Sequence, residues 1–169
     1  LIIKINMQYA PQGWDLSKEV EKLGISNMQE GRQVQFIINN LTVDQLRKLY
    51  NTCDVTVFPT RAEAFNLAIL EGFACGKPTI TSNFGGQLDY VSEENGWLIN
   101  GKLEEVTHDI QYEGIRWFTP DMPSLRKLMR WCFEHQDEVR TKGLRALETA
   151  NGMTWKHSAE KLLDAISKL

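Results

Sequence analysis

Short apolar runs separated by amphipathic stretches dominate this 169-residue sequence and restrict the folds open to it. The runs are rich in β-branched residues and are too short for helices, so they predict strands that are apolar on both faces. Strands of this kind are typical of a parallel sheet whose two faces are covered by helices. The predicted strands span Leu1–Ile5, Val34–Ile38, Val55–Phe58, Thr79–Ser82 and Trp97–Ile99.

The segments between the runs carry apolar residues at helical spacing. One helix is predicted from Asp15 to Leu23, and a second opens with a capping-box pattern at Thr42–Gln45. A third carries the stripe Leu67, Leu70 and Ala74, and it stops at Gly76–Pro78. Strands that alternate with helices predict an α/β fold with a Rossmann-like parallel sheet flanked by helices.

The C-terminal third is predicted to be helical. A helix is expected to start at Thr119-Pro120-Asp121 with Thr119 as its cap, and a second to run from Asp137 to Ala150. A third follows Trp155, with Ala159, Leu162, Leu163 and Ile166 expected to face inward. Between Asn100 and Phe118 the pattern is weak and predicts a long loop. We expect residues 1–169 to form a single domain.

Composition excludes several classes of protein. The formal net charge of −3 argues against nucleic-acid binding by bulk charge. No apolar run reaches the ~20 residues of a membrane span, and membrane contact is not evident from the sequence. The three cysteines, Cys53, Cys75 and Cys132, are far apart and form no C-x-x-C pair. That pattern favours a reducing compartment, and hence the cytoplasm, over a disulfide framework or a zinc site.

Two glutamates flank the start of the helix that follows the Val55–Phe58 strand. Ligands bind at the carboxyl ends of the strands in open α/β sheets, and the free N–H groups of a helix start suit phosphates. Glu63 lies in the loop and Glu71 on the second helical turn, so the pair can reach two ends of a ligand that crosses the helix start. Alternatively, Glu63 is a helix-start acid and Glu71 is solvated. The apolar neighbours of Glu71 favour the functional interpretation, because an idle carboxylate is costly there.

A second strand-end loop carries the glycine pair Gly85-Gly86 after the Thr79–Ser82 strand. Glycines let a ligand such as a diphosphate approach the backbone closely. A plain strand-to-helix turn accounts for the pair equally well, and the sequence leaves both interpretations open.

The order and spacing of these motifs resemble the C-terminal domain of GT-B glycosyltransferases of the retaining family 4 group. The resemblance covers most of the chain from about residue 34. Its best-defined part is the family's E-x-F-G-L and E-x7-E pattern, which is matched by Glu63–Leu67 and Glu71. The other matching segments are Pro59-Thr60, Ala74–Pro78, Gly85-Gly86, Asp89, Gly96–Ile99, Trp117–Asp121 with Leu125 and Met129, and Thr154-Trp155.

The resemblance implies a role for each residue of the E-x7-E segment. Glu63 would bond the donor sugar and is the candidate catalytic residue. The backbone of Ala64–Leu67 would meet the sugar or the diphosphate. Glu71 would accept hydrogen bonds from the nucleotide ribose. Asn66 replaces the family's glycine, and asparagine tolerates the left-handed backbone that the glycine provides.

Two other segments receive weaker roles. Asn39, in the loop that follows the Val34–Ile38 strand, would lie near the base. The family holds the diphosphate with an Arg and a Lys from the first strand–helix unit of this domain. The resemblance places that unit, and an acceptor-binding N-terminal domain, upstream of Leu1. Within this chain, Arg61 and Lys77 are the nearest basic candidates for the diphosphate.

The implied function is the donor-binding part of a retaining glycosyltransferase that moves a hexosyl group from a nucleotide-diphospho-sugar. Its expected partners are the nucleotide sugar and its own N-terminal domain. The sequence has no D-x-D metal-binding pair, so we expect neither a required divalent metal nor another cofactor. Two alternatives remain: a GT-B epimerase or hydrolase that acts on the same nucleotide sugars, and a non-catalytic α/β binding module.

Overall fold

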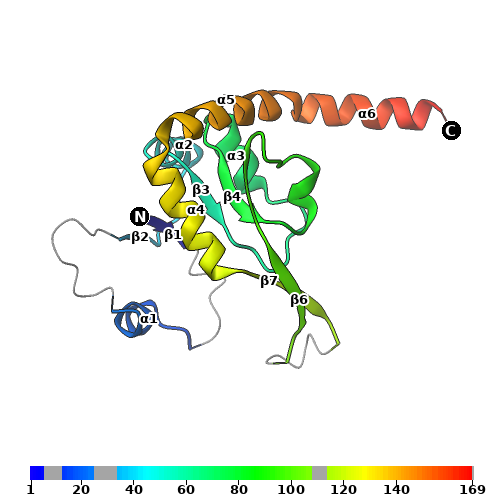
Figure 1. Cartoon of the computed structure of the whole chain (residues 1–169). Coiled ribbons are helices and arrows are strands. Elements are labelled where there is room, and N and C mark those ends of the chain that lie inside the picture. Colours follow the sequence, from blue (N-terminus) through cyan, green and yellow to red (C-terminus); the bar gives the residue numbers. More distant parts are fainter. Residues whose placement is uncertain (6–12, 25–33, 108–113, 169) are drawn as a thin grey trace. The chain divides into compact units, whose positions relative to one another are not determined.

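The computed structural model describes residues 1–5, 13–24, 34–107 and 114–168 (Figure 1). The chain forms two compact units, Leu1–Gln45 and Leu46–Leu169, and each is described separately below. The expectation of a single domain stays a prediction.

The first unit contains a small parallel sheet. Strands β1 (Ile2–Lys4) and β2 (Gln35–Ile37) pair in parallel, with Ile3 opposite Phe36. Helix α1 (Leu16–Lys22) begins after Asp15, whose carboxylate accepts a hydrogen bond from the backbone N–H of Ser17 at 2.8 Å. Both strands and the helix lie within the ranges predicted from the sequence.

Helix α2 (Val43–Asn51) opens with the predicted capping box. The backbone N–H of Thr42 donates to Gln45 Oε1 at 2.9 Å, and the backbone N–H of Gln45 lies 3.3 Å from Thr42 Oγ1. Each side chain therefore satisfies a donor at the helix start that has no partner within the helix.

A three-stranded parallel sheet organises the second unit. Strands β3 (Thr56–Phe58), β4 (Thr79–Ser82) and β5 (Gly96–Ile99) pair in the order β3-β4-β5. Helix α3 (Leu67–Ala74) connects β3 to β4, and a short 3-10 helix, η2 (Gly86–Asp89), follows β4. The carboxyl ends of β3 and β4 therefore open into two neighbouring loops, which carry the motifs singled out in the sequence.

Apolar clusters cover both faces of this sheet, with side chains from α3, α4 (Met122–Glu134) and α5 (Gln136–Gly152). Alternate strand residues point to opposite faces, so Leu98 joins one cluster while its neighbours Trp97 and Ile99 join the other. The first cluster contains Ile69, Phe73, Tyr90, Val91, Ala146 and Ala150. The second contains Ile80, Trp97, Ile99, Leu125, Cys132 and Val139.

The end of α3 is a Schellman turn, as the Gly76 stop signal predicts. Gly76 has a φ of 68°, its N–H donates to Phe73 O, and the N–H of Lys77 donates to Gly72 O. Helix α5 crosses this turn at Gly143, where a Cβ atom would lie 2.4 Å from Gly76 O. A glycine is needed on α5 because two backbones meet there.

The segment between Asn100 and Phe118, predicted as a loop, forms an antiparallel ribbon in its described parts. Strands β6 (Gly101–Glu105) and β7 (Arg116–Pro120) pair with Leu103 opposite Phe118. The ribbon is mostly exposed, so few of its side chains are selected for burial and the alternating apolar pattern of a strand is weak.

The start of α4 also differs from the prediction. Thr119 and Pro120 complete β7, and the helix is capped by Asp121, whose Oδ2 accepts a hydrogen bond from the N–H of Ser124 at 3.0 Å. The proline of the first helical turn is Pro123. The sequence offers two similar helix starts, Thr119 followed by Pro120 and Asp121 followed by Pro123, and local pattern does not distinguish them.

Helix α6 (Trp155–Ser167) begins at the predicted position, capped by Thr154, but its apolar residues are not buried. Leu162, Leu163 and Ile166 are 61%, 66% and 56% exposed, so the expectation that they face inward is wrong within this chain. Figure 1 shows why: α6 continues from the end of α5 and extends beyond the rest of the second unit. None of the helices in the described part of the chain is long and apolar enough to cross a membrane.

Candidate functional site

The loops that follow β3 and β4 are bonded to each other at the carboxyl edge of the sheet. Ser82 Oγ donates to Thr60 O at 2.6 Å, and the N–H of Gly86 donates to Glu63 O at 3.2 Å. These bonds place the Glu63–Leu67 segment beside the glycine pair, as expected for two neighbouring strand ends.

The glycine pair makes room for the neighbouring loop. A Cβ atom on Gly86 would lie 1.7 Å from Ala64 O, and one on Gly85 would lie 2.8 Å from Glu63 O. Gly85 also has a φ of 100°, which side-chain-bearing residues rarely adopt. Of the two interpretations left open by the sequence, the geometry favours the structural turn over close approach of a ligand.

Gln87 joins the same two loops from inside. Its side chain is fully buried, and Nε2 lies within hydrogen-bonding distance of Thr60 Oγ1, Ser82 O and Phe84 O. Its Oε1 has no hydrogen-bond partner among the described residues. Leaving a buried acceptor unpaired costs about 1–3 kcal/mol, which the packing of the two loops must offset.

The carboxylate of Glu63 is held by the backbone of its own loop. Oε1 accepts hydrogen bonds from the N–H groups of Ala64, Asn66 and Phe65 at 3.0, 3.2 and 3.4 Å. No described residue donates to the second oxygen, Oε2. Glu63 is thus a half-buried acceptor with one oxygen anchored and the other available for a ligand.

Asn66 adopts the left-handed conformation expected of it, with φ 64° and ψ 69°, at the N-terminal cap of α3. A left-handed backbone costs an L-residue roughly 1–2 kcal/mol. The hydroxyl of Tyr90 lies 2.6 Å from Phe65 O and 2.8 Å from Asn66 O, so it supports this turn. Burial, with the negative charge of Glu63 as a second cause, raises the pKa of Tyr90, and the hydroxyl remains a donor at neutral pH.

The same geometry refines which backbone groups a ligand can meet. The N–H groups of Ala64, Phe65 and Asn66 already serve Glu63, whereas those of Leu67 and Ala68 have no acceptor among the described residues. These two groups lie at the N-terminus of α3, where the helix dipole favours negative charge. They are the backbone donors best placed for a phosphate.

Glu71 lies on the second turn of α3, exposed to solvent. Its Oε2 accepts a hydrogen bond from the hydroxyl of Tyr50 at 3.1 Å, and that hydroxyl also lies 3.0 Å from Ala68 O. Burial and the charge of Glu71 raise the pKa of Tyr50, so it stays a donor. Because the carboxylate is exposed, the argument that an idle charge would be costly there is wrong, and the case for Glu71 rests on its position.

Arg61 is oriented toward the β6–β7 ribbon. Its guanidinium carbon lies 5.3 Å from the centroid of the Trp117 ring, and Nη2 lies 3.5 Å from Thr119 Oγ1. The N–H of Phe118 also donates to Arg61 O at 2.9 Å. Asn39 belongs to the first unit, and its proximity to the nucleotide base stays a prediction.

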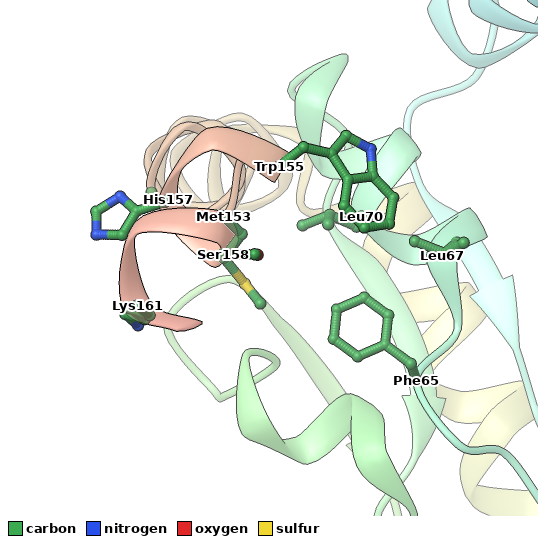
Figure 2. A pocket seen from close by; sticks show the side chains of 9 residues that line it. Phe65, Leu67, Leu70, Met153, Trp155, His157, Ser158 and Lys161 are labelled. Atoms are coloured by element: carbon green, nitrogen blue, oxygen red, sulfur yellow. The ribbon is translucent and has the colours of Figure 1, made fainter. Parts of the chain in front are cut away.

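A small apolar pocket of about 200 Å³ lies between the starts of α3 and α6 (Figure 2). Phe65, Leu67 and Leu70 form one side and Met153 and Trp155 the other. Polar side chains of α6 complete the lining, namely His157, Ser158 and Lys161. Leu67, the first residue of α3 and the last of the E-x-F-N-L segment, therefore also lines this apolar pocket.

Sequence reasoning missed Tyr50, Gln87 and Tyr90, which hold the two glutamates and their loops in place. Tyr50 lies on α2, and nothing local in the sequence indicates that its hydroxyl reaches α3. In the described parts of the chain, no group of three or more His, Cys, Asp or Glu side chains is arranged to hold a metal ion.

Comparison with known proteins assigns the chain to a family. The family model described as "Glycosyl transferases group 1" matches residues 14–118. The D-inositol 3-phosphate glycosyltransferase of Nocardia farcinica is 29% identical over 125 residues, covering 73% of this chain and 24% of that protein. The serotype-specific mannosyltransferase WbdA of Escherichia coli is 27% identical over 129 residues, covering 76% of this chain and 14% of that protein. The chain therefore spans a quarter or less of the length of these relatives.

Solved structures agree on the fold. The Anabaena protein Alr3699/HepE, crystallised with UDP-glucose, superposes with a TM-score of 0.70 at 20% identity, covering 99% of this chain and 40% of that one. The C-terminal domain of the group 1 glycosyl transferase LpcC from Francisella tularensis gives 0.56 at 14% identity, covering 80% of this chain and 58% of that domain structure. The α/β fold predicted from the sequence is thereby confirmed as that of the GT-B glycosyltransferases. With its E-x7-E segment between β3 and α3, its parallel sheet and its family match, this chain belongs to the group 1 glycosyltransferases.

Proposed function

We propose that this chain is the donor-binding part of a retaining glycosyltransferase that transfers a hexosyl group from a nucleotide-diphospho-sugar. The observation that carries the proposal is the arrangement of the E-x7-E pair. Glu63 presents one free carboxylate oxygen at the strand end, and Glu71 presents an exposed carboxylate on the second turn of α3. Between the two glutamates in the sequence lie the N–H groups of Leu67 and Ala68, which have no acceptor among the described residues.

In this arrangement each group has a distinct task. Glu63 Oε2 accepts hydroxyls of the donor sugar, while the three loop N–H groups keep the carboxylate oriented. The N–H groups of Leu67 and Ala68 and the helix dipole offset the charge that develops on the leaving diphosphate. Glu71 accepts the ribose hydroxyls, oriented by Tyr50.

Two features of the relatives support the nucleotide-sugar assignment. One superposing Anabaena structure holds UDP-glucose and another holds UDP. Curated relatives are named as a glycosyltransferase and a mannosyltransferase. We propose that a nucleoside-diphospho-hexose of this type is the donor here and that its transfer requires no divalent ion. We also propose that the protein works in the cytoplasm, and that a separate N-terminal domain of a longer protein holds the acceptor.

Calorimetric titration of the chain with UDP, GDP and ADP tests the proposal. We expect one of the three diphosphates to bind, and we expect Glu71→Ala to weaken that binding by about 1.5–3 kcal/mol, the range for a hydrogen bond to a charged group. Glu148→Ala, which removes an exposed glutamate on α5 that bonds Arg145, is the matched control and should bind within a few-fold of the parent chain. If none of the diphosphates binds, the chain is a non-catalytic module instead.

A turnover assay separates the transferase from the epimerase and hydrolase alternatives. The longer protein is incubated with the nucleotide sugar in the absence of acceptor. A transferase leaves the donor largely intact, whereas an epimerase or hydrolase converts it at the full rate. The E-x-F-N-L loop favours the first outcome, because an enzyme that only rearranges the nucleotide sugar does not need it.

A further inference from the structure

Tyr90 lies outside the sequence motifs, yet it is buried against Phe65 and Asn66 of the Glu63–Leu67 segment. Its side chain is 7% exposed, and its ring packs against Phe65 and Phe73 with centroid distances of 5.0 and 6.0 Å. The ring is therefore fixed, and so is the hydroxyl at its tip. That hydroxyl lies within hydrogen-bonding distance of two consecutive carbonyls, Phe65 O and Asn66 O.

One peptide unit connects Tyr90 to Glu63. The peptide bond between Phe65 and Asn66 contributes the carbonyl of Phe65, bonded by Tyr90 at 2.6 Å, and the N–H of Asn66, bonded to Glu63 Oε1 at 3.2 Å. The described residues contain no cis peptide, so this carbonyl and this N–H point in opposite directions. The peptide plane is thus held from both sides, by Tyr90 on one and by Glu63 on the other.

The turn that contains this peptide needs support. Asn66 is the one described residue other than glycine with a positive φ, a conformation that glycine adopts freely and asparagine does not. If the turn relaxes, the N–H groups that hold Glu63 Oε1 rotate away from the carboxylate. The hydroxyl of Tyr90 opposes this relaxation because its single proton is shared between the carbonyls on both sides of the Asn66 Cα atom.

We propose that Tyr90 is a positioning residue for sugar recognition: through the Phe65–Asn66 peptide it fixes the orientation of the Glu63 carboxylate. The inference rests on the proposed function, because it takes Glu63 as the group that meets the donor sugar. Tyr90 is not itself placed to touch a ligand, because its side chain is buried and its hydroxyl faces the two carbonyls. Its loss therefore reduces what the sugar adds to binding and leaves the affinity for the nucleotide unchanged.

The test compares Tyr90→Phe with Tyr50→Phe, a matched control in which another tyrosine loses a hydroxyl that bonds a backbone carbonyl near α3. The first readout is amide hydrogen exchange in the whole chain, measured by NMR. In Tyr90→Phe the amides of residues 64–66 should exchange about fivefold faster, whereas Tyr50→Phe leaves them within twofold of the parent chain.

The second readout is the sugar increment, the ratio of the dissociation constants for the nucleoside diphosphate and for its sugar ester. The probes are whichever of UDP, GDP and ADP binds most tightly, and its glucose or mannose ester. Tyr90→Phe should lower the increment at least about fivefold with the diphosphate affinity unchanged. Adding Asn66→Gly to Tyr90→Phe should restore the increment, because glycine holds the turn without the hydroxyl.

The outcomes are separable. If the parent chain binds no diphosphate, the proposed function fails, while the exchange of amides 64–66 still decides whether Tyr90 controls the loop. Unchanged exchange together with an unchanged increment overturns the role of Tyr90. So does an equal loss of diphosphate and sugar-ester affinity, which marks a merely structural residue. If Tyr90→Phe does not fold, the double variant with Asn66→Gly is measured instead, because glycine removes the strain of the left-handed turn. A sugar increment below that of the parent chain in the double variant overturns the inference.

Discussion

Replacing Glu63 by glutamine tests the central feature of the site, because it preserves size and removes charge. The amide of glutamine can satisfy the three loop N–H groups only with its oxygen. Its NH₂ group must then point where Oε2 points now. An acceptor for sugar hydroxyls is thereby replaced by a donor, while the loop keeps a weakened version of its three hydrogen bonds.

The magnitude follows from the three distances. A hydrogen bond to a charged group is worth about 1.5–3 kcal/mol and a neutral one about 0.5–1.5 kcal/mol. Two of the three bonds to Oε1 are long, at 3.2 and 3.4 Å, and the side chain is half-buried. We therefore count the charge as worth about 1.5 kcal/mol of folding free energy, which for a chain of this size lowers the melting temperature by roughly 3–6 °C.

Function should be more sensitive than stability. In the longer protein we expect Glu63→Gln to lower kcat/KM at least about tenfold, roughly 1.4 kcal/mol of transition-state stabilisation. Affinity for the bare nucleoside diphosphate should stay within a few-fold. The control is Glu71→Gln, whose exposed carboxylate bonds no backbone N–H. It should leave the melting temperature within 1–2 °C and weaken the diphosphate instead.

Thermal melting by circular dichroism, calorimetry with the diphosphate, and initial rates with the sugar ester provide the three measurements. A Glu63→Gln chain that melts like the parent would refute the view that the loop N–H groups anchor an ionised carboxylate. A variant that loses bare diphosphate binding as much as turnover would refute the division of labour between the two glutamates.

Three further predictions concern other parts of the chain. Gly86→Ala should destabilise the chain by at least about 3 kcal/mol in denaturant titration, since its Cβ would overlap Ala64 O, whereas Gly152→Ala meets nothing within 4 Å and should be neutral or slightly stabilising. Burial raises the pKa of the Cys132 thiol to about 11. Between the unfolded value near pH 8.5 and about pH 10, where the tyrosines do not yet titrate, the unfolded chain therefore binds fewer protons at this thiol than the folded one, and the contribution of Cys132 to the free energy of unfolding should fall by at most about 1.4 kcal/mol per pH unit. Cys132→Ala should flatten that slope in thermal melts at graded pH. Residues 1–169 alone should transfer no sugar from UDP-glucose or another donor to any acceptor, and measurable transfer by the purified chain would contradict the two-domain proposal.

The sequence predicted the features that local chemistry determines. The Thr42–Gln45 capping box and the Gly76 stop each depend on residues a few positions apart, and both are present. The left-handed backbone of Asn66 was expected from the family resemblance, and it is present too. The features it missed depend on the tertiary structure. The hydroxyl of Tyr90 reaches across 24 and 25 positions to its carbonyl partners, and no periodicity encodes that contact.

The errors have a physical pattern as well. The β6–β7 ribbon and helix α6 are largely exposed, so burial does not select their side chains in the way that the prediction assumed. The stripe of Leu162, Leu163 and Ile166 was correctly placed on a helix, but periodicity cannot say whether a partner covers it. The positions of Glu63 and Glu71 were predictable because the strand-loop-helix order alone determines them.

The mutual bonding of the two strand-end loops has a consequence for engineering a new donor preference. Gly86 admits no side chain against Ala64, and Tyr90 bonds the carbonyls of the turn that orients Glu63. In a mutant library that randomises residues 63–66, replacements of Glu63 and Asn66 should therefore destabilise the loop, whatever sugar the library is screened against, whereas the exposed Ala64 should tolerate other side chains. A change of donor preference that moves the backbone of the loop after β3 must therefore include changes in the loop after β4, because Gly86 and Tyr90 contact that backbone directly.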